Sequence, residues 1–170
     1  MGREIRRVPP HWEHPRYTKA SAPSSERIGE YRSCNDEDYD TASQRWLEEL
    51  DQWRAGVHED QKYSKTKYYW DYAGAPPDED TCRPAFTEPP TWVQVYQTIS
   101  EGTPVTPPFA TEQELIDYLV AHGDFWDQER GDGGWERKNA ETFVKRGSAP
   151  SMIVVRSAEG TTIQTPRDME

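Results

Sequence analysis

The stretch WVQVYQTISEGTPVTPPFATEQELIDYLVAHG, residues 92–123, encodes a strand, a stiff connection and a helix in succession. Residues 92–99 form a short segment rich in β-branched side chains, which favours a β-strand over a short buried helix. Thr111 is a typical N-cap, and Glu114 three positions later completes a capping box. We therefore predict a helix over residues 111–122. The prolines before it explain a rigid approach to the helix without requiring a ligand.

Two more helices and a hairpin follow from similar patterns. Apolar residues at helical spacing predict a helix over residues 39–55, whose buried stripe is expected to be Ala42, Trp46, Leu47, Leu50 and Trp53. A third helix is predicted over residues 136–146, before a glycine. The segments SMIVVRS and TTIQT, separated by AEG, predict a C-terminal β-hairpin. We expect an α+β fold in which these three helices pack on a small antiparallel sheet made from strand 92–99 and the hairpin.

Arginine, lysine and proline dominate the first part of the chain. Residues 1–33 are therefore predicted to form an extended basic arm, with one short strand over residues 5–8, and residues 34–170 to form a single compact domain. Aromatic residues followed by five prolines predict a long loop, held down by the aromatics, between about residues 68 and 90. The segment GDFWDQERGDGGWERK, residues 123–138, is interpreted as a loop rich in glycine and aspartate.

The charge of the chain restricts its partners. The chain has 170 residues, a formal net charge of −11 and a pI near 4.9. Such a charge disfavours direct binding to nucleic acid or to an anionic membrane, and it favours basic protein surfaces as partners. No apolar run approaches the roughly 18 residues that a membrane span requires, and the start of the chain lacks the apolar segment of a signal peptide. We therefore expect the protein in the cytoplasm.

Residues that bind metals or carry out catalysis do not occur in a recognisable pattern. His11 and His14 are three residues apart, but the prolines around them oppose a helix, and no cysteine pair lies nearby in the sequence. Cys34 and Cys82 are too few for a disulfide framework and are expected as free thiols in polar loops. The motifs G-x-S-x-G, G-x-x-x-x-G-K and G-x-G-x-x-G are absent from the sequence. We predict no cofactor, no metal and no enzymatic activity.

Acidic and aromatic residues give the strongest indication of a binding surface. The acids near residues 35–60 and the loop between Trp126 and Trp135 are the two candidate contact regions, because tryptophans anchor interfaces and carboxylates suit a basic groove. In that loop the acids resemble a calcium-binding loop, but a glycine stands where an oxygen ligand is needed. The predicted partner-binding residues are Asp36, Glu37, Asp38, Asp40, Glu48, Glu49, Asp51, Trp126, Asp127, Glu129, Asp132 and Trp135.

Several segments together resemble a family of small, mostly uncharacterised proteins of tailed bacteriophages and prophages. The segments are REIRRVPPHWEHP, KYYWDYAGAPPDED, SEGTPVTPPFATEQEL, GGWERKNAETFV and APSMIVV. The resemblance covers most of the chain outside about residues 18–33 and the last dozen residues. It implies a location in the cytoplasm of a bacterial host during infection, or alternatively in the virion. It implies no catalytic residues.

Three hypotheses of function remain open from the sequence. The first is a phage-encoded acidic accessory protein that binds and inhibits a host or bacterial-defence protein by occupying a groove that normally receives nucleic acid. The second is a structural or assembly component of the phage particle. The third is a small hydrolase that uses carboxylates. The oligomeric state does not follow from the sequence.

Overall fold

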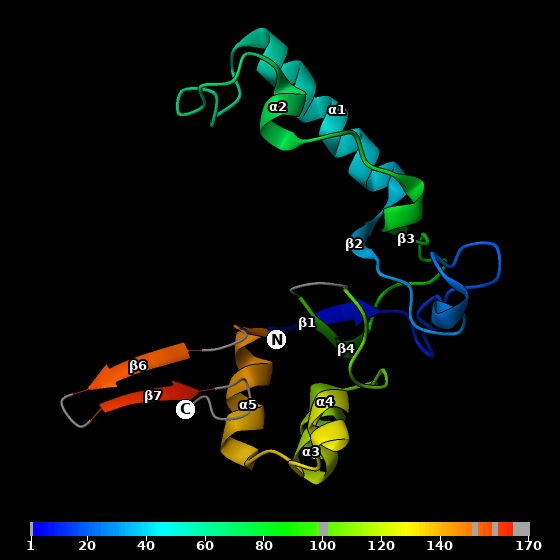
Figure 1. Ribbon diagram of the computed structural model, residues 1–170, viewed down its shortest axis with the longest axis vertical. Coiled ribbons are helices and arrows are strands. Elements are labelled where there is room, and N and C mark those ends of the chain that lie inside the picture. Colours follow the sequence, from blue (N-terminus) through cyan, green and yellow to red (C-terminus); the bar gives the residue numbers. More distant parts are fainter. Residues whose placement is uncertain (1, 99–101, 151–152, 158–159, 165–170) are drawn as a thin grey trace. The chain divides into compact units, whose positions relative to one another are not determined.

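The chain forms two compact units (Figure 1). Residues 1–33 and 86–170 together form one unit, which we call the sheet unit, and residues 34–85 form the other, which we call the acidic unit. This division differs from the expected arm followed by a single domain. The predicted α+β fold is confirmed. The structure is a computed structural model, and it describes residues 2–98, 102–150, 153–157 and 160–164.

The sheet of the sheet unit has the strand order β4-β1-β5. Strand β1 (Arg3–Val8) lies at its centre and runs antiparallel to β4 (Trp92–Gln97), with Val8 opposite Trp92. The short strand β5 (Ser148–Ala149) pairs with the other edge of β1. Residues 1–33 are therefore not only an extended arm, because their first strand holds the sheet together.

The C-terminal hairpin is confirmed, but it does not extend the main sheet as expected. Strands β6 (Ile153–Ser157) and β7 (Gly160–Gln164) pair with each other in a separate two-stranded sheet. The expected partner of β4 was therefore wrong. Every residue of β4 from Val93 to Gln97 is buried, so the strand needs cover on both faces and at both edges, and β1 supplies one edge.

The proline-rich segment 103–109 supplies the other edge of β4. Val105 N–H donates to the carbonyl of Val95 over 2.8 Å, and Val93 and Phe109 exchange two backbone hydrogen bonds of 2.8 and 2.9 Å. The prolines of this segment have no N–H to donate, so the residues between them make the ladder contacts. The segment is therefore more than a stiff connection, because it closes an edge at which another chain could pair.

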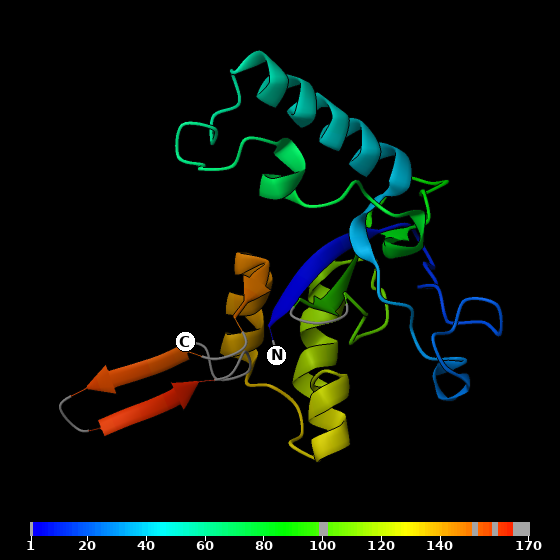
Figure 2. The ribbon, with the colours of Figure 1, turned by 45° about the horizontal axis from the view of Figure 1, so that its top comes forward.

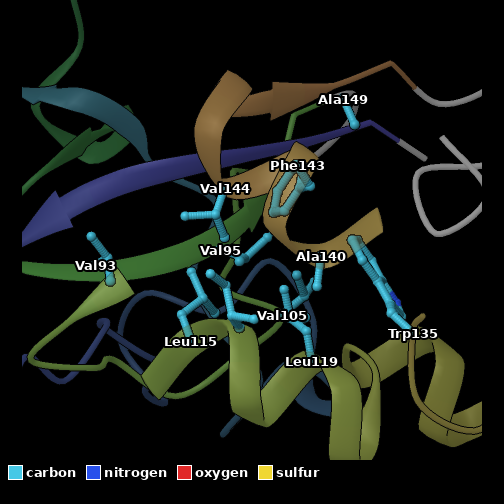
Figure 3. Close-up of a cluster of buried hydrophobic side chains, with 11 residues drawn as sticks. Val93, Val95, Val105, Leu115, Leu119, Trp135, Ala140, Phe143, Val144 and Ala149 are labelled. Atoms are coloured by element: carbon cyan, nitrogen blue, oxygen red, sulfur yellow. The ribbon is translucent and has the colours of Figure 1, made fainter. Parts of the chain in front are cut away.

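Three helices of the sheet unit follow β4 along the chain. They are α3 (Glu112–His122), the short α4 (Phe125–Arg130) and α5 (Arg137–Arg146). The predicted capping box is present, because the Thr111 side chain accepts from Glu114 N–H while the Glu114 side chain accepts from the backbone of Thr111. The main core lies between these helices and the sheet (Figure 3). Its buried members are Val93, Val95, Val105, Leu115, Ile116, Leu119, Trp135, Ala140, Phe143, Val144 and Ala149.

The acidic unit is built around the long helix α1 (Tyr39–Ala55), which matches the predicted helix and ends at Gly56 in the left-handed conformation (Figure 2). Its other elements are β2 (Asn35–Asp38), α2 (Tyr69–Ala73), a 3-10 turn (Glu79–Thr81) and β3 (Cys82–Arg83). The region expected as one long loop thus contains a short helix and a strand that pairs with β2 in parallel.

The core of the acidic unit is small and aromatic. Leu50 and Trp53 of α1 pack with Tyr69 of α2, and Trp46 lies against them. The indole of Trp53 donates to the carbonyl of Lys67 over 3.1 Å, which ties the chain before α2 to α1. This small unit has few aliphatic side chains, so aromatic rings provide most of the apolar surface in its core.

Candidate protein-binding surface

The acidic unit carries most of the negative charge of the protein. Residues 34–85 contain thirteen acidic side chains against six basic ones, a formal charge of −7 out of −11 for the whole chain. This unit accounts for fewer than a third of the residues. The electrostatic attraction to a basic partner is therefore concentrated in one small part of the molecule.

Helix α1 has a buried side and an exposed side. Ala42, Leu50 and Trp53 are buried. Residues spaced three, four or seven positions apart lie on the same side of a helix, so the exposed residues of α1 form a stripe on the side away from this core. We call this the acidic stripe, and its members are Asp40, Gln44, Leu47, Glu48 and Asp51.

Leu47 lies in the middle of the acidic stripe. Its side chain is 56% exposed, although leucine is an apolar residue, and three carboxylates flank it along the helix. An apolar side chain surrounded by charged groups is the arrangement of many interface centres. The sequence assigned Leu47 to the buried stripe of the helix, and this assignment was wrong, because Leu50 and Trp53 fill that side.

Three of the other predicted acids make contacts within the acidic unit. Glu37 accepts from Arg45 over 2.7 Å, and Glu49 accepts a hydrogen bond from the hydroxyl of Tyr69. Asp38 is the N-cap of α1, and the backbone N–H of Thr41 is the main reason that the pKa of its carboxyl lies below the ordinary value. These side chains hold the unit together. Asp40, Glu48 and Asp51 are exposed, although Glu48 accepts from Gln44 over 2.9 Å and Asp51 pairs with the exposed Arg54 at 3.5 Å.

In the second predicted contact region, between Trp126 and Trp135, both tryptophans and Asp127 face the interior, whereas residues 128–133 are exposed. Trp135 is 3% exposed and belongs to the main core, and Asp127 is 2% exposed. Trp126 is half-buried, and its indole donates to the Gln97 side chain over 3.1 Å. Of the predicted residues in this segment, Glu129 and Asp132 are exposed. The expectation of a tryptophan-anchored surface loop was therefore wrong.

The reason is that this segment contains a capped helix. The Asp124 side chain accepts hydrogen bonds from the backbone N–H groups of Trp126 and Asp127, and the Asp127 side chain accepts one from the backbone N–H of Asp124, so the two residues form a capping box for α4. Arg3 of β1 forms a buried ion pair with Asp124 and so ties α4 to the sheet. The spacing of two aspartates three positions apart is the sequence signal that would have predicted this helix.

The acidic unit also exposes aromatic side chains that were not predicted from the sequence to lie on a binding surface. Tyr68 and Trp70 are 45% and 49% exposed, and their rings stack in parallel with centroids 4.8 Å apart. Tyr63 is 78% exposed. Only Tyr69 in the run KYYWDY is buried, and a run of adjacent aromatics on one helical turn must leave some of them outside. These side chains add aromatic anchors to a unit that already carries the charge.

Within the described part of the chain, no three His, Cys, Asp or Glu side chains are grouped so that they could hold a metal ion. Nor does any helix there have the length and apolar character needed to cross a membrane. Cys34 and Cys82 do not form a disulfide, but both are buried rather than placed in polar loops as expected. Burial raises the pKa of the Cys82 thiol, which makes it a poor nucleophile.

Comparison of the chain with protein-family models, with curated proteins and with solved structures gave no match. The resemblance to phage proteins therefore stays a prediction from the sequence. The surface of the acidic unit therefore carries the proposed function.

Proposed function

We propose that this protein is a phage-encoded acidic accessory protein that binds a basic surface of a host or bacterial-defence protein and inhibits it. The binding surface is the acidic stripe of α1, and the observation that supports it is the placement of Asp40, Glu48 and Asp51 around the exposed Leu47. These carboxylates do not cap α1, and they lie opposite its core. The surface best suited to receive them is a groove that normally binds nucleic acid.

The dimensions of the stripe fit such a groove. Asp40 and Asp51 are eleven residues apart, which corresponds to about 16 Å along a helix. A row of negative charge of this length can replace several phosphates along a nucleic-acid strand, while Leu47 adds an apolar contact that phosphates lack. Charge attraction would speed association, and the apolar contact would slow dissociation.

The proposal is tested by capture of partners from bacterial host lysate at low and at moderate salt. The variant Asp40→Asn/Glu48→Gln/Asp51→Asn removes three charges from the acidic stripe. The control Glu88→Gln/Glu129→Gln/Glu141→Gln removes three charges from exposed positions of the sheet unit. We expect a protein that is retained by the wild type and the control, lost by the stripe variant, and released as salt rises.

A second measurement tests inhibition directly. The captured protein is purified, and its binding to a labelled nucleic acid is measured with increasing amounts of wild type, stripe variant or control. Competition by the wild type and the control, with none by the stripe variant, is the expected result. Equal capture by all three proteins, or capture without competition, contradicts the proposed role of the stripe in inhibition.

A further inference from the structure

The sheet unit contains a cavity of about 730 Å³ that the proposed function does not use. Its lining includes four aromatic side chains from separate segments: Trp12 and Tyr31 from the N-terminal region, Tyr118 from α3 and Phe125 from α4. Val105 and prolines of the 103–109 segment form another part of the lining. The volume is typical of sites for small molecules, and the lining combines apolar with polar groups in similar measure.

A network of hydrogen bonds holds one wall of the cavity in place. The hydroxyl of Tyr96 accepts from the indole of Trp12 over 3.1 Å and donates to Gln94 over 3.0 Å. The Gln94 amide donates in turn to the carbonyl of Thr106 over 2.8 Å. His14 lies 3.3 Å from the same tyrosine hydroxyl and donates from Nε2 to the carbonyl of Arg32 over 2.7 Å. These buried bonds fix Trp12 and Gln94, so the wall is formed before any ligand arrives.

Arg16 brings a positive charge to the cavity. Its guanidinium lies over the ring of Tyr31 at 3.9 Å, and its Nη1 donates to the carbonyl of Gly29 over 2.7 Å. Among the described residues, no carboxylate forms an ion pair with Arg16. A guanidinium has five N–H donors, so several remain for a ligand.

Arginine charges act on the cavity lining at His14 although the protein as a whole is acidic; of these arginines, Arg16 lines the cavity and Arg6 is paired with Glu4. The pKa of His14 is lowered to about 4, mainly by burial and in part by the charges of Arg6, Arg32 and Arg16, while the hydrogen bond to the Arg32 carbonyl raises it. The one carboxylate in the lining is that of Glu13, which is exposed. The positive charges of these three guanidinium groups thus disfavour protonation of His14 at this end of the cavity.

We propose that this cavity binds a small planar ligand that carries an anionic group, with the ring against the aromatic lining and the anion at Arg16. The ring would stack on aromatic side chains in offset or edge-to-face geometry. The guanidinium would hold a carboxylate or a phosphate through two parallel hydrogen bonds. This inference is independent of the proposed function, because the acidic stripe and the cavity belong to different units.

The test uses two anionic probes, indole-3-acetate and adenosine 5′-monophosphate, and their neutral counterparts, indole-3-acetamide and adenosine. Binding to the full chain is followed by amide and indole chemical shifts in NMR titrations. Each anionic probe that binds is expected to bind about tenfold more tightly than its neutral counterpart, which corresponds to one charged hydrogen-bonding pair, and to shift the Trp12 indole resonance. Binding of only one anion identifies the preferred group as carboxylate or phosphate.

Three variants locate the charge that is responsible. Arg16→Gln is expected to abolish the preference for the anion, and Arg16→Lys to retain part of it. Arg27→Gln is the matched control, because Arg27 also lies over a tyrosine ring, that of Tyr17, but pairs with Glu30 and does not line the cavity. Glu13→Gln should leave anion binding unchanged or strengthen it.

Three results overturn the proposal. The first is the absence of binding by all four probes up to millimolar concentration. The second is equal affinity for the anionic and neutral members of both pairs. The third is an unchanged preference in Arg16→Gln, with a spectrum that remains well dispersed.

Discussion

The indole Nε1 of Trp135 donates a 2.6 Å hydrogen bond to Oδ2 of Asp127, and both side chains are buried. The same carboxylate accepts from the backbone N–H of Asp124 and from Arg130. The backbone N–H of Trp135 donates to the carbonyl of Leu119 in α3. The tryptophans of this segment are therefore packed inward, and its buried carboxylates Asp124 and Asp127 are satisfied by hydrogen bonds there.

This relationship predicts a large effect of a small change. Asp127→Asn keeps the size of the side chain but removes its charge and replaces one accepting oxygen with an NH2 group. Either Arg130 or the two buried donors on Oδ2, Trp135 and the backbone of Asp124, then lose their acceptor. We expect the free energy of unfolding to fall by about 2 kcal/mol. Urea denaturation followed by circular dichroism measures it. Glu129→Gln, two residues away and exposed, is the control and should change stability by less than about 0.5 kcal/mol. Equal effects would contradict a structural role of the buried carboxylate.

The three longer helices, α1, α3 and α5, could be predicted from the sequence because their signals are local, whereas the short α2 and α4 were expected as loops. Thr111 with Glu114, and Gly56 after α1, act within one turn of the chain, and the predicted boundaries agree with the structure within about a residue. The pairing of β1 with β4 joins residues about 90 positions apart. The β-branched side chains of residues 92–99 indicated a strand, and a short strand was expected over residues 5–8, but neither local signal carries information about which strand pairs with which.

The close approach of Gly134 to α3 gives a second prediction. A Cβ atom at Gly134 would lie 1.9 Å from the carbonyl oxygen of Val120, so the backbone would have to move. We expect Gly134→Ala to reduce the free energy of unfolding by about 3 kcal/mol. Gly131→Ala is the comparison, because Gly131 has a φ of +72° and no atom within 4 Å of its Cβ position. That change should cost about 1 kcal/mol through backbone strain alone. If Gly131→Ala proves the more harmful, the contact with Val120 is not rigid.

The hydrogen bond from Tyr69 to Glu49 gives a third prediction. Burial and then Glu49 raise the pKa of Tyr69 to about 12, so the hydroxyl stays protonated as a donor at all ordinary pH values. Tyr69→Phe should destabilise the acidic unit by about 1 kcal/mol, because the ring still fits and one hydrogen bond is lost. Amide hydrogen exchange within α1 measures the effect in this unit. Tyr63→Phe, at a 78% exposed position, should leave exchange unchanged. Faster exchange in both variants would contradict a specific role of Tyr69.

The candidate surface could be predicted only in part, and the reason is physical. The sequence does not distinguish a carboxylate that is exposed to solvent, like that of Asp40, from one that accepts a hydrogen bond from a side chain distant in the sequence, like that of Glu49. An aromatic residue likewise gives no local signal of burial. Trp135, expected in a surface loop, is 3% exposed, whereas Trp70, in a segment that the aromatics were expected to hold down, is 49% exposed. The cavity could not be predicted, because its walls come from separate segments that only the fold brings together.

The burial of His14 makes the stability of the sheet unit depend on pH. The folded protein holds this side chain neutral, with a pKa of about 4, whereas the ordinary pKa of histidine is 6.5. Between these two pH values the unfolded chain therefore binds more protons than the folded chain, so protonation favours unfolding. The stabilisation is complete above about pH 7 and is lost as pH falls through the range from 6.5 to 4. At pH 5 the loss amounts to about 2 kcal/mol relative to pH 7.5.

Carboxylates also titrate at low pH, so the test compares two proteins rather than two pH values alone. The free energy of unfolding of the wild type and of His14→Gln is measured at pH 7.5 and at pH 5. Glutamine does not titrate, and its amide can still donate to the carbonyl of Arg32. We expect the wild type to lose about 2 kcal/mol more than the variant between these pH values. His122→Gln, at an exposed position at the end of α3, is the control and should follow the wild type. An equal pH dependence in wild type and His14→Gln would mean that His14 is not held neutral in the folded protein.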